Sequence, residues 1–150
     1  MTNLKDIANK MTEKGKGILA ADESTPTCKN RFDSIGVEST FENRNEYRDL
    51  LITAEGMEQY IGGVIMFDET LRQSTTCSEN ILFPDFLNSK NVVPGIKVDA
   101  GAKDLAGFKG EKVTEGLDGL RDRLAEYYNL GARFTKWRAV ITIGNNIPSM

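Results

Sequence analysis

Charged side chains follow three short apolar runs of this sequence, and their types point to chemistry on an anionic substrate. The residues are Asp22, Lys97, Asp99, Lys136 and Arg138. A charge inside a buried strand costs several kcal/mol unless a partner or water compensates it. At the carboxyl end of a strand, beside a pocket, the same charge can be used. Lysines, an arginine and acids gathered there would suit a phosphorylated substrate and amine chemistry.

Each of these charges also has a simpler structural explanation. Lys136 and Arg138 are two residues apart and would share one face of a strand, which would be a solvated edge. Lys97 and Asp99 would form an internal ion pair, and Asp22 would be a turn or capping residue before Ser, Thr and Pro. Their repetition favours the functional interpretation, because catalytic groups of parallel barrels lie at the carboxyl ends of different strands.

The residue types that are missing exclude several mechanisms. The sequence contains no histidine, which excludes histidine triads, histidine zinc sites and imidazole acid–base catalysis within this chain. Cys28 and Cys77 are too far apart in sequence for a local metal motif and are expected to be reduced thiols. Chemistry must therefore rest on lysine, arginine, carboxylates and hydroxyls.

The composition indicates an ordinary globular domain. The chain has 150 residues, 39% hydrophobic and 27% charged, which suffices for one core. A net charge of −3 argues against a nucleic-acid partner. The longest apolar run, 61–67, is far shorter than the ~20 residues that cross a bilayer, and the N-terminus is not a secretory signal. We therefore expect a cytoplasmic protein without a membrane or nucleic-acid partner.

Apolar periodicity predicts helices that alternate with strands. An amphipathic helix is predicted over 4–11, and strands are predicted to start near residues 18, 61, 92 and 132. The first two strands read as buried, and the fourth is predicted to run to about Ile143. Helices are predicted over 25–35, behind a capping box at 39–42, over 83–90 and over 117–128, with loops over 74–80 and 100–116.

This alternation predicts an α/β fold with a parallel sheet and outer helices. Four strand–helix units, preceded by an N-terminal helix, would form the first half of a (β/α)8 TIM barrel, whose usual size is about 250 residues. Residues 1–150 are thus predicted to be a single partial barrel domain. Residues 145–150 read as a loop and the first turn, started by Pro148, of a further helix, so we expect a truncated chain whose remaining barrel units are absent.

Six segments carry a family resemblance over essentially the whole chain. They are Gly17–Thr25 (GILAADEST), Phe41–Arg48 (FENRNEYR), Ile61–Thr70 (IGGVIMFDET), Gly95–Asp99 (GIKVD), Thr114–Leu120 (TEGLDGL) and Lys136–Arg138 (KWR). In this order they resemble class I fructose-bisphosphate aldolase, through its fourth barrel strand.

The resemblance implies a lyase of glycolysis and gluconeogenesis that needs no metal and no cofactor. It would cleave fructose 1,6-bisphosphate reversibly to dihydroxyacetone phosphate and glyceraldehyde 3-phosphate through a lysine Schiff base. Two residues match catalytic positions: Asp22, an acid that acts in proton transfer, and Lys136, a charged neighbour of the Schiff-base lysine. An iminium is an electron sink, so cleavage of the C3–C4 bond would release an enamine.

Five further residues match substrate-binding positions of the family. Lys97 and Arg138 would contact hydroxyl or phosphate oxygens of the sugar. Ser24 and Arg31 would line a phosphate site, and Arg44 matches an arginine assigned to substrate binding. The phosphosugar is the expected small-molecule partner, and the full-length protein is expected to be a homo-oligomer.

The resemblance also limits what this chain can do alone. The family's Schiff-base lysine lies on the sixth strand and a catalytic glutamate on the fifth, both beyond Met150, so we expect these residues alone to be inactive. Two alternatives stay open. One is another phosphosugar barrel with different Schiff-base or enediol chemistry, and the other is a non-catalytic half-barrel that binds phosphate or a partner subunit.

Overall fold

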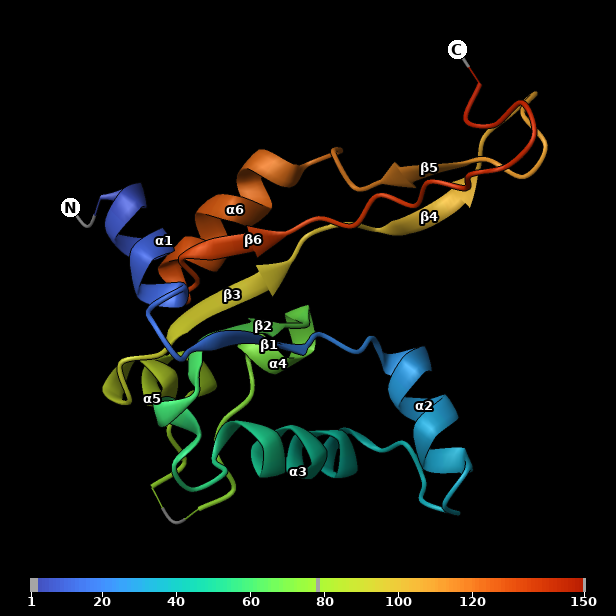
Figure 1. Ribbon diagram of the computed structural model, residues 1–150. Coiled ribbons are helices and arrows are strands. Elements are labelled where there is room, and N and C mark those ends of the chain that lie inside the picture. The colour runs from blue at the N-terminus through green and yellow to red at the C-terminus, as the bar shows by residue number, and fades with distance from the viewer. Residues whose placement is uncertain (1–2, 78, 150) are drawn as a thin grey trace.

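A parallel sheet forms the centre of the structure (Figure 1). The computed structural model describes residues 3–77 and 79–149, and within these ranges four parallel strands form one sheet in the order β1–β2–β3–β6. The strands are β1 (Gly17–Ala21), β2 (Ile61–Met66), β3 (Val93–Lys97) and β6 (Phe134–Lys136). This arrangement confirms the predicted α/β class and the positions at which the strands begin.

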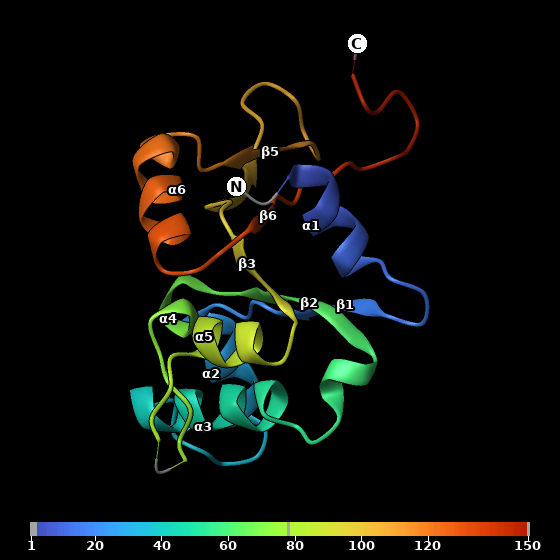
Figure 2. The same ribbon diagram turned by 90° about the vertical axis from the view of Figure 1, so that its left-hand side faces the viewer.

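Helices connect the strands and cover the sheet. α1 (Leu4–Met11) precedes β1, and α2 (Thr25–Asp33), α3 (Phe41–Ile52) and the short 3-10 helix η1 (Met57–Gln59) lie between β1 and β2. α4 (Asp68–Leu71) and α5 (Phe83–Ser89) lie between β2 and β3, and α6 (Leu120–Asn129) precedes β6. Figure 2 shows α3, α4 and α5 below β1 and β2, with α1 and α6 above them. None of the helices in the described ranges is long and apolar enough to cross a membrane.

The hydrophobic core lies between the sheet and the helices α3 to α5. Val64 and Met66 of β2 are fully buried, as are Ile52 of α3 and Leu87 of α5, and Ile96 of β3 is 1% exposed. A strand covered on both faces requires apolar residues at successive positions, which explains the unbroken apolar run of β2. The helices thus pack mainly against the two middle strands of the sheet, β2 and β3.

Two glycines permit close packing against the sheet. A Cβ atom on Gly62 would lie 2.5 Å from the carbonyl oxygen of Met11, at the end of α1. A Cβ atom on Gly95 would lie 2.3 Å from the ring of Phe134. A larger residue at either position would force the backbone or the ring to move. Gly95 therefore allows the Phe134 ring to cross β3, and this contact helps to place β6.

The segment 100–116, predicted as a loop, contains an antiparallel hairpin. It consists of β4 (Gly101–Asp104) and β5 (Lys112–Glu115), which pair from Gly101–Glu115 to Asp104–Lys112. The two short strands are largely exposed and satisfy each other's backbone groups without burying an apolar face. The sequence therefore shows little apolar alternation there, and the hairpin was not predicted.

β6 is much shorter than predicted, since it ends at Lys136 and not near Ile143. The N–H of Val98 donates to the carbonyl of Lys136, and the chain after β3 then turns into β4, so residues beyond 136 find no further partner on β3. Asn145 and Asn146 form a turn closed by a bridge between Gly144 and Ile147, in agreement with the predicted loop. The helical turn predicted to start at Pro148 is not formed in the described residues, since Pro148 is a bend and Ser149 has no regular structure.

Smaller corrections concern β1 and α3. β1 was predicted to be buried, but it is an edge strand paired only with β2, and Ile18 is 44% exposed. The N-cap of α3 is Thr40, whose hydroxyl accepts from the N–H of Asn43, and not Ser39. The predicted loop 74–80 includes Ser78, which lies outside the described residues.

Candidate active site

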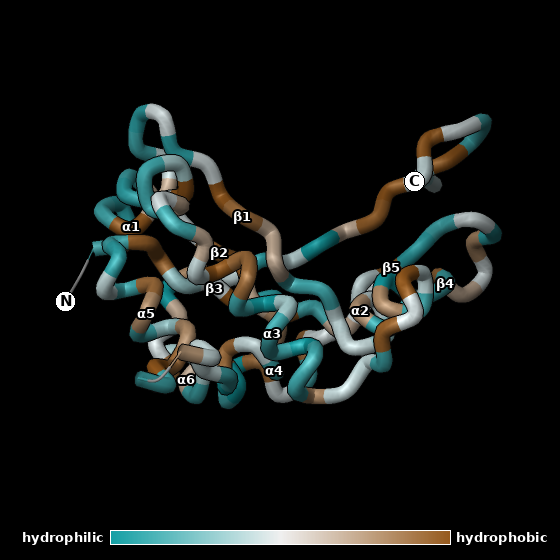
Figure 3. The backbone as a smooth tube through the Cα atoms, turned by 90° about the horizontal axis from the view of Figure 1, so that it is seen from below, coloured by the Kyte–Doolittle hydropathy of each residue, from teal (hydrophilic) through white to brown (hydrophobic). Residues whose placement is uncertain are grey.

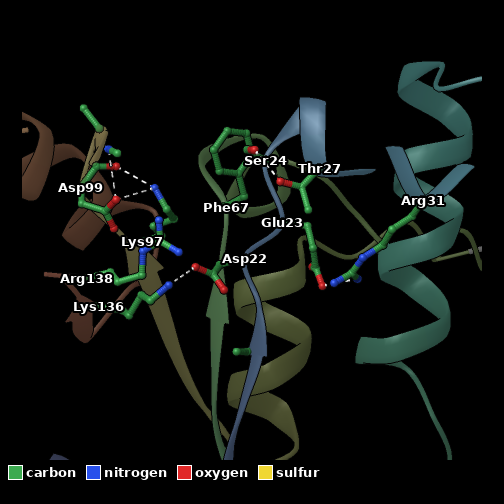
Figure 4. A pocket seen from close by; sticks show the side chains of 13 residues that line it. Asp22, Glu23, Ser24, Thr27, Arg31, Phe67, Lys97, Asp99, Lys136 and Arg138 are labelled. Carbon is green, nitrogen blue, oxygen red and sulfur yellow. Dashed lines mark hydrogen bonds and ion pairs between the residues drawn. The ribbon is translucent and has the colours of Figure 1, made fainter. Parts of the chain in front are cut away.

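A pocket of about 570 Å³ lies at the carboxyl ends of the parallel strands (Figure 4). Its lining comes from the ends of β1, β3 and β6, from the segments that follow β1, β2, β3 and β6, and from α2. The charged lining residues are Asp22, Glu23, Arg31, Lys97, Asp99, Lys136 and Arg138. Four of these are cationic and three are acidic, so the pocket has a formal charge of +1 in a chain whose net charge is −3. Such a site can attract an anion although the protein as a whole is acidic.

One ion pair joins residues from the two edges of the sheet. The Lys136 ammonium lies 2.7 Å from Oδ2 of Asp22, and the two side chains are 29% and 13% exposed. Asp22 follows β1 and Lys136 ends β6, with β2 and β3 between them. Neighbouring strands lie about 4.8 Å apart, so the two edges of a flat four-stranded sheet would be well separated. A contact between residues of opposite edges therefore indicates that the sheet is curved. Curvature of the sheet thus brings an acid and an amine together.

A second ion pair joins the last residue of β3, Lys97, to Asp99, two residues further along the chain. The Lys97 ammonium lies 3.0 Å from Oδ1 of Asp99 and 2.7 Å from the Asp99 carbonyl oxygen. Burial by itself raises the pKa of the Asp99 carboxyl. The hydrogen bond and charge of Lys97, the Gly101 N–H and the charge of Lys136 together outweigh burial, and the pKa lies below its ordinary value. Asp99 is therefore a carboxylate at neutral pH.

The far side of the pocket is built from α2 and the turn before it. Nη1 of Arg31 donates to Oε1 of Glu23 over 2.6 Å and contacts the Tyr47 hydroxyl over 2.6 Å. The hydrogen bond and the charge of Glu23 raise the pKa of Arg31, whose side chain remains 52% exposed. The Ser24 and Thr27 hydroxyls lie 3.1 Å apart at the start of α2. In Figure 4, Arg31 lies on one side of Asp22, and Lys97, Lys136 and Arg138 lie on the other.

Arg138 lines the pocket from beyond the end of β6. The strand ends at Lys136, so Arg138, contrary to the prediction, is not part of it, although both side chains line the same pocket. The Arg138 carbonyl accepts a hydrogen bond of 2.7 Å from the Thr114 hydroxyl of β5. The hairpin thus supports the segment that carries Arg138.

Arg44 lies outside the pocket, in an ion cluster with Glu69 and Arg48. Its Nε and Nη2 atoms lie 2.9 and 2.6 Å from the two carboxylate oxygens of Glu69, and Nη1 donates to the Ser39 carbonyl. The fully buried Arg48 contacts the same carboxylate over 2.5 Å. The hydrogen bond from Arg44, with those from Arg48, lowers the pKa of Glu69 despite its burial. The structure therefore places Arg44 in the packing of α3 against α4.

The amino-acid sequence matches, over residues 3–150, the family model described as fructose-bisphosphate aldolase class-I. The chain belongs to the class I fructose-bisphosphate aldolase family. This finding confirms the resemblance deduced from the six segments.

Relatives of the aldolase family support the same assignment. A protein of Xanthomonas axonopodis pv. citri named "Probable fructose-bisphosphate aldolase class 1" is 56% identical over 146 residues, 97% of this chain and 43% of its own length. Cytosolic fructose-bisphosphate aldolase 4 of Arabidopsis thaliana is 57% identical over 90% of this chain and 34% of its own length. The solved structure of the Plasmodium falciparum aldolase, in complex with TRAP and an inhibitor, superimposes with a TM-score of 0.88 at 49% identity, over 94% of this chain and 40% of that one. This chain thus spans less than half the length of these relatives.

Six of the seven site residues expected from the aldolase resemblance lie in one pocket, and the seventh does not. The six are Asp22, Ser24, Arg31, Lys97, Lys136 and Arg138. Arg44 is the exception, and the substrate contact predicted for it has no support in this geometry. The chemical roles of the other six stay predictions.

Two acidic residues of the pocket, Glu23 and Asp99, were not among the seven expected from the aldolase resemblance, although Asp99 was one of the charges noted after the apolar runs. Glu23 pairs with Arg31, and Asp99 pairs with Lys97. The sequence did contain a signal for Asp99, because residues 97 and 99 lie on the same side of an extended segment. Glu23 had no comparable signal, since its partner lies on the next helix. Within residues 3–77 and 79–149, no cluster of three or more His, Cys, Asp or Glu side chains could hold a metal ion.

Proposed function

We propose that this chain forms the sugar-phosphate pocket of a class I aldolase and supplies two of its catalytic groups. The observation that carries the proposal is the Lys136–Asp22 contact of 2.7 Å inside a cationic pocket. An acid and an ammonium in contact suit the proton transfers that form an imine and then cleave a carbon–carbon bond. The imine-forming lysine would come from the part of the family's barrel that corresponds to its sixth strand.

Each catalytic group has a distinct proposed role. Asp22 would move a proton between itself and the substrate when the C3–C4 bond breaks. Lys136 would stay cationic beside the carbonyl carbon and favour the loss of water from the carbinolamine. The electron pair of the broken bond would pass into the iminium of the neighbouring lysine and leave an enamine.

The cations of the pocket would bind the ends of the sugar phosphate. Lys97 and Arg138 would contact oxygens on one side of Asp22, and Ser24 and Arg31 would hold a phosphate on the other (Figure 4). Positive groups on both sides of one acid fit a substrate with a phosphate at each end. The cytosol is the proposed location, as for the Arabidopsis relative, although a Chlamydomonas reinhardtii relative is named chloroplastic.

Binding tests the pocket directly. We expect fructose 1,6-bisphosphate to perturb NMR signals of residues at the ends of β1, β3 and β6, and Lys97→Met or Lys136→Met to weaken binding at least about tenfold. Lys112→Met is the matched control, because Lys112 forms an exposed ion pair with Asp104 on the hairpin. Equal weakening by all three variants would show that only net charge matters.

Borohydride trapping tests the origin of the imine-forming lysine. With dihydroxyacetone phosphate, this 150-residue polypeptide should not become covalently labelled, and efficient labelling of any of its lysines would contradict the proposal. A chimera that joins residues 1–150 to the remaining part of the Xanthomonas relative should be labelled and should cleave fructose 1,6-bisphosphate. Asp22→Asn in that chimera should abolish cleavage. An inactive chimera that folds and still binds phosphate would instead support the non-catalytic half-barrel.

A further inference from the structure

Asp99 is the most deeply buried carboxylate of the pocket. Its side chain is 1% exposed, compared with 13% for Asp22 and 12% for Glu23. Oδ1 lies 3.0 Å from the Lys97 ammonium and accepts from the N–H of Gly101 over 3.1 Å. Oδ2 is buried and has no hydrogen-bond partner among the described residues. A buried carboxylate with one oxygen unpaired lowers the stability of the fold, so its presence in the pocket points to a functional role.

The pairing of Lys97 with Asp99 is entirely local. The ammonium contacts both the carboxylate and the backbone carbonyl of the same residue. The other two ion pairs of the pocket, Lys136–Asp22 and Arg31–Glu23, each join different elements. Apart from the N–H of Gly101 at the start of β4, the carboxylate of Asp99 contacts only Lys97, so its charge acts mainly on one cation of the binding site.

Lys97 has three N–H donors, and two of its contacts are spent on Asp99. A phosphate that binds Lys97 must share the ammonium with this carboxylate and must also approach the negative charge of Asp99. The charge is present at neutral pH, because Lys97 keeps the pKa of the buried Asp99 carboxyl below its ordinary value.

We propose that Asp99 is a positioning residue that fixes the Lys97 ammonium at the end of β3 and limits the strength with which the pocket holds phosphate. The inference rests on the proposed function, since it assumes that the pocket binds a sugar phosphate. Fixing the ammonium aims it at one substrate oxygen, while the adjacent negative charge prevents phosphate from being bound so tightly that product release becomes slow.

Asp99→Asn tests the proposal, because asparagine keeps an acceptor oxygen for the Gly101 N–H but removes the charge. The probe is inorganic phosphate, measured by calorimetry on the 150-residue chain at low ionic strength. We expect the affinity to rise about fivefold, since one negative charge close to the bound anion disappears. Asp104→Asn is the matched control: it removes the same charge from the exposed hairpin pair with Lys112 and should leave the affinity unchanged.

The double variant Lys97→Met/Asp99→Asn should lose the gain, because the gain requires a freed Lys97. A urea midpoint for each variant separates binding from stability. If Asp99→Asn does not fold, Asp99→Ser serves instead, since its hydroxyl can also accept from Gly101. A role in structure alone would lower stability and would not raise phosphate affinity.

A ligand-independent measurement separates this inference from the proposed function. In the wild type, the Lys97 ammonium should give a side-chain NMR signal protected from rapid exchange with water, and Asp99→Asn should remove that protection. If the wild type binds phosphate through Lys97 but Asp99→Asn behaves like Asp104→Asn, the inference is wrong and the proposed function stands. If neither the wild type nor any variant binds phosphate, the proposed function is wrong, and so is the proposal that Asp99 limits phosphate affinity. The NMR signal then decides whether Asp99 fixes Lys97, and equal protection in both proteins refutes it.

Discussion

The guanidinium of Arg48 connects the pocket to the core, although it never reaches the pocket itself. It is fully buried and lies 3.1 Å from the Glu23 carbonyl, 2.5 Å from Glu69 and 3.3 Å from Gln73. These contacts tie α3 to α4 and to the turn between β1 and α2. The buried guanidinium of Arg48 thus fixes the backbone next to Asp22 by its hydrogen bond to the Glu23 carbonyl, and the carboxylate of Glu69 balances its charge.

Replacing Glu69 by Gln should therefore be strongly destabilising. The change leaves the buried Arg48 without its carboxylate, and we expect the free energy of unfolding to fall by about 3 kcal/mol at pH 7. Urea unfolding followed by circular dichroism measures this loss. Asp33→Asn is the control, because its ion pair with Lys29 is exposed on both sides and contributes little. A loss for Glu69→Gln no larger than for Asp33→Asn would contradict the cluster's importance.

The same cluster predicts how stability depends on pH. The pKa of Glu69 is lowered in the folded state, chiefly by the hydrogen bond from Arg44, whereas an unfolded glutamate titrates near about 4.3. The contribution of Glu69 is thus complete above that unfolded value and is lost as the pH falls through the lower folded pKa. Urea midpoints measured from pH 7 to pH 3 should fall less steeply for Glu69→Gln than for the wild type. Parallel curves would refute this assignment.

At the scale of elements, the parallel pairing of β6 with β3 is accompanied by one unusually close side-chain contact. The Phe134 ring lies where a Cβ atom of Gly95 would be, and Phe134 and Lys136 lie two residues apart in β6. Because residues two apart in a strand point to the same face, the ring and the ammonium share a side of the sheet. The Gly95–Phe134 contact, together with the backbone pairing of Lys97 with Lys136, therefore helps to set where Lys136 meets Asp22.

Gly95→Ala should disturb β6 and the Lys136–Asp22 pair together. The new methyl group would lie 2.3 Å from the ring, so we expect a loss of about 2 kcal/mol in unfolding free energy and NMR shift changes at Lys136. Gly17→Ala is the matched control, because a Cβ there meets nothing within 4 Å. Adding Phe134→Leu to Gly95→Ala should recover part of the loss. Equal stability of the two glycine variants would show that the ring moves aside freely.

At the scale of the whole molecule, both edges of the sheet are open. Among residues 3–77 and 79–149, β1 pairs only with β2, and β6 pairs only with β3. Beyond β6 the chain extends away from the helices toward the C-terminus and carries apolar residues, as Figure 3 shows. Ile141 and Ile143 there are 70% and 85% exposed. Unpaired edges and exposed apolar side chains together favour association between chains.

We expect the chain to associate as its concentration rises, measured by light scattering. Ile141→Lys combined with Ile143→Lys should reduce association, because charges oppose edge-to-edge pairing. Leu50→Lys is the control, since Leu50 is also exposed, at 74%, but lies on α3 away from the sheet edges. A wild type that stays monomeric at every concentration would contradict this prediction.

Much of the fold was predictable because its causes are local. The apolar run of β2 and the amphipathic spacing of α1 each arise from neighbouring residues, and each element begins where the sequence predicts. The hairpin of β4 and β5 was missed, because its strands are stabilised by each other and bury little. The length of β6 was overestimated, because a strand continues only as far as its neighbour does.

For the site, the sequence predicted which charges lie at or just after the strand ends. It also offered a Lys97–Asp99 ion pair as an alternative explanation, since residues two apart in an extended segment point the same way, and this pair forms. The contact between Asp22 and Lys136 was not predictable from the sequence, because the two residues are 114 positions apart and meet through the curvature of the sheet. The pairing of Arg44 with Glu69, outside the pocket, was not predictable either, since a guanidinium binds whichever carboxylate the packing of the helices brings nearest.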